Sequence, residues 1–189
     1  MKANFKNGKN KINFRFSAKW LSYAGVLMFL YMLMVGGWFR GWQPILIIPL
    51  SIAVAMRECE KPLSISAFAA VCGLIIDIAS ANLFGFSGIW LLPGSLTACL
   101  LSSYLIKANL LNFIWLNAIM CVVMAAADYF FNYALWDVAG HMYVLTDFVI
   151  PAYLSTILFS PALYFAVKFL SAKLSPHEHS RPYSQLKED

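Results

Sequence analysis

The segment GLIIDIASANLFGFSG, residues 73–88, combines an apolar run with a single acid and three glycines. It places the carboxylate of Asp77 inside an apolar helical pattern and follows it, eight residues later, with Gly85. An ionisable side chain within a membrane span costs ~2.5–3.5 kcal/mol on insertion scales and usually faces the interior of a helix bundle. The segment therefore predicts a membrane helix that ends at a turn near Gly85.

The composition of the whole chain indicates a lipid environment. Of its 189 residues, 61% are hydrophobic and 12% are charged, whereas a soluble domain carries roughly 45–50% apolar and about 25% charged residues. The net charge of +5 does not indicate nucleic-acid binding, because six of the 14 Lys and Arg residues lie in the first 19 positions and no basic stripe follows a soluble element. We therefore expect an all-α integral membrane protein that does not bind nucleic acid.

Six segments are apolar enough to form the helices of one transmembrane bundle. They are residues 20–38, 44–56, 63–83, 88–106, 110–133 and 148–170. The second segment is short for a hydrocarbon core of ~30 Å, so it would require a locally thinned bilayer or residues from the preceding connection. The expected organisation is a basic arm (1–19), a six-helix transmembrane domain (20–170) and a disordered polar tail (171–189).

The distribution of basic residues predicts the orientation. If the N-terminus is cytoplasmic, 13 of the 14 Lys and Arg residues fall in cytoplasmic segments, and Arg40 alone falls outside. Such an excess of basic residues is typical of cytoplasmic loops. Both termini are therefore predicted to lie in the cytoplasm.

Two acids occur within the expected spans, Asp77 in the third and Asp128 in the fifth. Both helices run in the same direction, and both acids lie toward the outer ends. No intramembrane Lys or Arg is available as a partner, so hydroxyl, amide and backbone groups, including the amide of Asn82, are the candidates. A structural role at a helix end is favoured over a substrate or proton role.

Small residues precede Asp77 on one helical face. Ser66, Ala70 and Gly73 fall at i, i+4 and i+7, and Asp77 continues the series. Such faces let helices approach closely in lipid, so we expect the third and fifth helices to pack with Asp77 and Asp128 facing a common interior.

Gly85, with Gly88 after it, is expected to let the connection turn back over the bundle. If Asp77 only accepts hydrogen bonds there as a cap, its replacement by Asn should be tolerated.

The spacing of Gly73, Asp77 and Gly85, with a second acid at Asp128, resembles the MreD family, small membrane proteins of the rod-shape-determining machinery of bacteria. The resemblance extends over about residues 20–170, and it concerns the length, the number of helices and the topology of this part of the chain. The chain departs from it at Ala81, where many members have glycine, and in its longer, more basic arm. The resemblance implies a six-helix bundle similar to the S component of energy-coupling-factor transporters.

The resemblance also implies a function. It implies a non-catalytic scaffold in the bacterial cytoplasmic (inner) membrane that serves peptidoglycan synthesis during cell elongation. Its partners would be MreC, the actin-like MreB, and the transpeptidase and glycosyltransferase of the elongation complex, held through helix–helix contacts. No cofactor or metal is expected, because the His177 and His179 pair lacks further ligands.

Two other classes of function remain as alternatives. The chain could be the substrate-binding S component of an energy-coupling-factor vitamin transporter, which needs a polar pocket near the outer face. Residues that could line such a pocket are Asp77, Asn82, Trp90, Asp128, Asn132, Trp136 and His141. Intramembrane aspartyl proteases use two acids that share a proton, but the sequences around Asp77 and Asp128 lack their Gly-x-Gly-Asp pattern, so no enzyme activity and no catalytic residue is expected.

Overall fold

The computed structural model describes residues 2–37, 43–59, 61–80, 83–104, 108–136 and 141–174, with the backbone alone at 2–16 and 141. The described residues form helices and short connections, with no strand among them. In chain order the elements are α1 (Lys2–Val35), α2 (Ile47–Arg57), α3 (Pro62–Ser80), α4 (Phe86–Tyr104), α5 (Leu110–Tyr129), the π-helix η1 (Phe130–Ala134), α6 (His141–Val144), the π-helix η2 (Leu145–Val149) and α7 (Ile150–Leu174).

Five helical stretches are long and apolar enough to cross a membrane. They are Ser17–Val35, Pro62–Ser80, Phe86–Tyr104, Leu110–Ala134 and Met142–Leu174. A stretch of 19 residues is about 28 Å long at the rise of an α-helix, which matches a hydrocarbon core of about 30 Å. Large apolar side chains such as Phe29, Trp115 and Leu158 cover their outward faces. The chain thus has the architecture of a multi-pass helical membrane protein.

The short helix α2 lies at the centre of the bundle. Every residue from Ile47 to Met56 is buried. Helices α4 and α7 make the most extensive contacts with α2, and α3, α5 and α1 cover the rest of its surface. A helix that is apolar on all sides is stable only when it is enclosed in this way. Ahead of it, the Ile45 amide donates a hydrogen bond of 2.8 Å to Thr156 Oγ1. The short second segment is therefore surrounded by protein rather than lipid, so its length need not match the bilayer.

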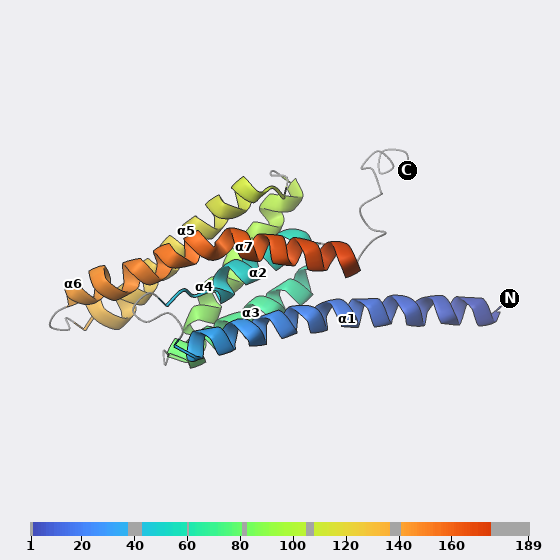
Figure 1. Cartoon of the computed structure of the whole chain (residues 1–189), viewed down its shortest axis with the longest axis horizontal. Helices are drawn as coiled ribbons and strands as arrows, with labels where there is room; N and C mark the ends of the chain where they lie inside the picture. Colours follow the sequence, from blue (N-terminus) through green and yellow to red (C-terminus); the bar gives the residue numbers. More distant parts are fainter. Residues whose placement is uncertain are drawn as a thin grey trace.

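The two ends of the bundle differ in charge. The start of α1 and the end of α7 lie at the same end, where α1 extends past the other helices (Figure 1). We name this the basic end, and the basic residues there whose side chains are described are Lys19, Arg57, Lys61, Lys168 and Lys173. The opposite end is the acidic end, and its described acids are Asp77, Asp128 and Asp147.

The prediction that the third helix packs against the fifth is wrong. Among the described elements α3 packs most extensively against α4 and also contacts α2 and α1, whereas α5 packs mainly against α7 and α2. The connection from α3 to α4 is only five residues long, and a short connection makes consecutive antiparallel helices neighbours. The surface of α3 that carries Gly73 and Asp77 therefore meets α4 and not α5.

Candidate functional site

The Asp77 carboxylate joins the end of α3 to the start of α4. Its Oδ2 accepts a hydrogen bond of 2.7 Å from the Gly85 amide, and its Oδ1 accepts one of 3.0 Å from the Ser87 amide. Asp77 is 1% exposed. The first N–H groups of a helix have no partner within the helix and attract negative charge. One side chain therefore satisfies two backbone donors where α4 begins.

Glycines allow the two helices to meet beside this carboxylate. A Cβ placed on Gly73 would lie 2.3 Å from Gly88 Cα and 2.5 Å from Gly88 N. Gly85 has φ of +92°, a conformation that side chains other than glycine rarely adopt. We name Gly73, Asp77, Gly85, Ser87 and Gly88 the α3–α4 junction.

The other small residues of α3 have lesser parts in this contact. A Cβ on Gly88 would make an ordinary contact of 3.9 Å with the Ala70 carbonyl oxygen, so Ala70 lies under the start of α4. Ser66 is half-buried, and its hydroxyl donates a hydrogen bond of 2.7 Å to the Pro62 carbonyl of its own helix. Ala70 therefore borders the junction, and Ser66 lies outside it.

Replacing Asp77 by Asn tests the double hydrogen bond. The sequence predicts that this substitution is tolerated, and the geometry predicts that it is not. Each Asp77 carboxylate oxygen accepts a backbone hydrogen bond, whereas the side chain of Asn has one acceptor oxygen and can keep only one of the two bonds. We expect Asp77→Asn to lower the free energy of unfolding by ~1–3 kcal/mol, measured as loss of monodisperse protein on heating in detergent. The matched control is Asp147→Asn at an exposed position of the same end, and equal stability losses in the two variants would contradict this role.

Alanine substitutions at three glycines test the close approach of α3 and α4. We expect Gly73→Ala to destabilise by ~1–3 kcal/mol, as overpacking does, because the added methyl group meets backbone. Gly88→Ala should be tolerated, since its Cβ would make only an ordinary contact, and Gly25→Ala should be neutral, since no atom lies within 4 Å of its Cβ. Thermal unfolding in detergent measures all three, and a stable Gly73→Ala variant would refute the contact.

The second acid lies in different surroundings. Asp128 is half-buried near the end of α5, and its Oδ1 accepts a hydrogen bond of 2.6 Å from Asn132 Nδ2. Asn132 belongs to η1, where the backbone leaves the α-helical pattern. Asp77 therefore accepts from the start of α4 and Asp128 accepts from η1, so the two acids bind different elements.

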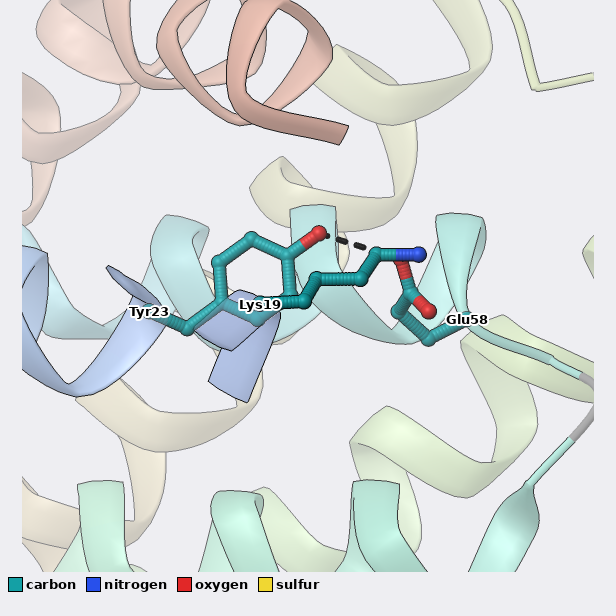
Figure 2. Close-up of polar contacts among 3 residues, drawn as sticks. All are labelled: Lys19, Tyr23 and Glu58. Atoms are coloured by element: carbon teal, nitrogen blue, oxygen red, sulfur yellow. Dashed lines mark hydrogen bonds and ion pairs between the residues drawn. The ribbon is translucent and has the colours of Figure 1, made fainter. Parts of the chain in front are cut away.

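A buried ion pair at the basic end was not anticipated from the sequence. Lys19 Nζ lies 2.6 Å from Glu58 Oε1, and the Tyr23 hydroxyl donates a hydrogen bond of 3.0 Å to the same oxygen (Figure 2). The Lys19 and Glu58 side chains are 9% and 13% exposed, and Trp20 packs edge-on against Tyr23. We name Lys19, Tyr23 and Glu58 the basic-end clamp, which fixes α1 to the connection after α2.

The clamp can be tested with a single and a double variant. Glu58→Gln should lower the free energy of unfolding by ~3 kcal/mol, because it removes the negative charge that lies 2.6 Å from the buried Lys19 ammonium. Adding Lys19→Met should restore most of that loss, since the buried positive charge is then removed as well. Thermal unfolding in detergent measures both, and a double variant no more stable than Glu58→Gln would contradict the ion pair.

The same connection is held to α4 by cysteine. The single proton of the Cys59 thiol is shared between two acceptors, the Ala55 carbonyl at 2.9 Å and the Cys99 carbonyl at 3.2 Å from Sγ. Burial, with the Cys99 contact, raises the pKa of the Cys59 thiol to about 12. A thiol that stays protonated at neutral pH is a poor nucleophile, so Cys59 acts as a contact residue here.

Several residues considered for function lie elsewhere. The structure does not describe Ala81, Asn82 or residues 175–189, which include His177 and His179. It describes His141 by its backbone alone. Trp136 is 74% exposed beyond η1. No group of three His, Cys, Asp or Glu residues in the described part of the chain could hold a metal ion.

The chain was compared with protein-family models, curated proteins and solved structures, and no match was found in any of the three comparisons.

Proposed function

We propose that the chain is a non-catalytic membrane scaffold of the bacterial cell-elongation machinery, similar in role to the MreD family. One observation supports this proposal above the others. Gly73, Asp77 and Gly85, the residues that carry the resemblance, meet in a single structural contact, the α3–α4 junction. Both carboxylate oxygens of Asp77 already accept backbone N–H groups, which favours a packing role over a substrate-binding one.

In this proposal the outward faces of the helices bind the partners. The faces carry large apolar side chains in α1, α5 and α7, including Met28, Val122 and Phe169, which lipid or partner helices can cover. The partners would be MreC, MreB, the transpeptidase and the glycosyltransferase of peptidoglycan synthesis. The junction would act by fixing the relative position of α3 and α4, and so the shape of the surface they present.

The proposed membrane is the bacterial cytoplasmic membrane, with the basic end in the cytoplasm. This orientation follows from the excess of Lys and Arg at that end, which is typical of cytoplasmic segments. Both termini would then be cytoplasmic, because α1 begins and α7 ends at the basic end (Figure 1).

Affinity purification of the tagged chain from its own membranes in mild detergent tests the function. We expect mass spectrometry to identify MreC and the wall-elongation enzymes with the wild-type chain and with Gly25→Ala. Recovery should fall for Gly73→Ala at matched membrane abundance, because the α3–α4 surface is displaced. Recovery of a transmembrane coupling subunit with ATP-binding cassette subunits would instead overturn the scaffold function in favour of a transporter.

A further inference from the structure

Arg57, the last residue of α2, has no carboxylate partner among the described residues. The neighbouring Glu58 is engaged by Lys19 and Tyr23, both at its Oε1 oxygen. The Nε atom of Arg57 is buried and has no hydrogen-bond partner. An ionised group that is partly removed from water without a counter-charge is unfavourable. The protein therefore holds a guanidinium whose charge its own described residues do not neutralise.

A rigid aromatic platform positions this guanidinium. Arg57 Cζ lies 5.3 Å from the centroid of the Tyr164 ring, and Nη2 lies 3.5 Å from the Tyr164 hydroxyl. That hydroxyl donates a hydrogen bond of 2.8 Å to the Ala108 carbonyl, and the ring packs against Phe113 at 5.2 Å. Tyr164 is 4% exposed. The arginine is half-buried, so part of it remains accessible above a fixed ring.

The surroundings of Arg57 add positive charge and apolar surface. Lys168 follows Tyr164 by four residues on α7, which places it on the same helical face one turn nearer the basic end. Lys168 is exposed. Phe165, beside Tyr164, is 54% exposed on the outward face of α7. Arg57 lies at the level where the spans Pro62–Ser80 and Leu110–Ala134 begin, because the Tyr164 hydroxyl beside it donates a hydrogen bond to the Ala108 carbonyl. We place the lipid headgroups at this level.

We propose that Arg57, held on Tyr164 and supported by Lys168, binds the phosphate group of an anionic phospholipid in the leaflet at the basic end. A guanidinium binds two phosphate oxygens in a planar geometry, and the Lys168 ammonium adds a second positive charge. Basic pockets between transmembrane helices bind anionic headgroups in this way. The acyl chains then lie along the outward face of α7 at Phe165. This site does not depend on the proposed function.

Native mass spectrometry of the purified full-length chain tests the site, with phosphatidylglycerol and phosphatidylethanolamine titrated separately. We expect the wild-type chain to bind phosphatidylglycerol more tightly than phosphatidylethanolamine. Arg57→Gln should weaken that binding about fivefold, the factor that corresponds to ~1 kcal/mol for one basic residue near an anionic surface. The matched control is Lys173→Gln, which removes an exposed charge at the same end and should leave binding unchanged.

Two results would overturn the proposal. One is unchanged phosphatidylglycerol binding by Arg57→Gln. The other is an equal loss in Lys173→Gln, which would show a diffuse surface charge. If Arg57→Gln instead binds lipid normally and loses a protein in affinity purification, the anion is a partner carboxylate.

A second variant keeps the test decisive if Arg57→Gln does not fold. Arg57→Lys preserves the charge and removes the planar pair of donors, so it should also bind phosphatidylglycerol more weakly than the wild type. Binding by Arg57→Lys equal to that of the wild type would contradict a site built on the guanidinium.

Discussion

The Asp77 carboxylate is the interaction on which the arrangement of α3 and α4 depends. Where a helix start is buried, its first N–H groups have no water to accept from them, and each unsatisfied group costs several kcal/mol. Asp77 accepts two of these groups at the start of α4 and is itself buried by the same contact. The carboxylate and the helix start therefore satisfy each other, and the glycine contact between Gly73 and Gly88 makes the required distance possible.

The same logic organises the opposite end of the bundle. The basic-end clamp pairs Lys19 with Glu58, while Cys59 attaches the same connection to α4. Between the two ends lies α2, which is enclosed on all sides and contributes apolar volume. Specific contacts at both ends thus surround a buried central helix, an arrangement compatible with the scaffold function that we propose.

The sequence was sufficient to predict the helical class, the number of apolar segments and a helix end near Gly85, where the structure places a hydrogen bond to Asp77. These follow from hydrophobic length, from the cost of a buried charge and from the spacing of small residues. The partner of α3 could not be predicted, because helical periodicity gives the face of a helix and not the neighbour that covers it.

The ion pair between Lys19 and Glu58 was missed for a related reason. The two residues are 39 positions apart and belong to different elements, so their meeting depends on tertiary packing. Lys19 and Tyr23, which lie at i and i+4 on one face of a helix, were the available signal.

The central claim is that Asp77 holds the start of α4, and its most direct test is hydrogen exchange at the Gly85 and Ser87 amides. The exchange is measured in lipid nanodiscs for the wild-type protein and for Asp77→Ala. Our account predicts slow exchange in the wild type and fast exchange in the variant, and fast exchange in both would contradict it.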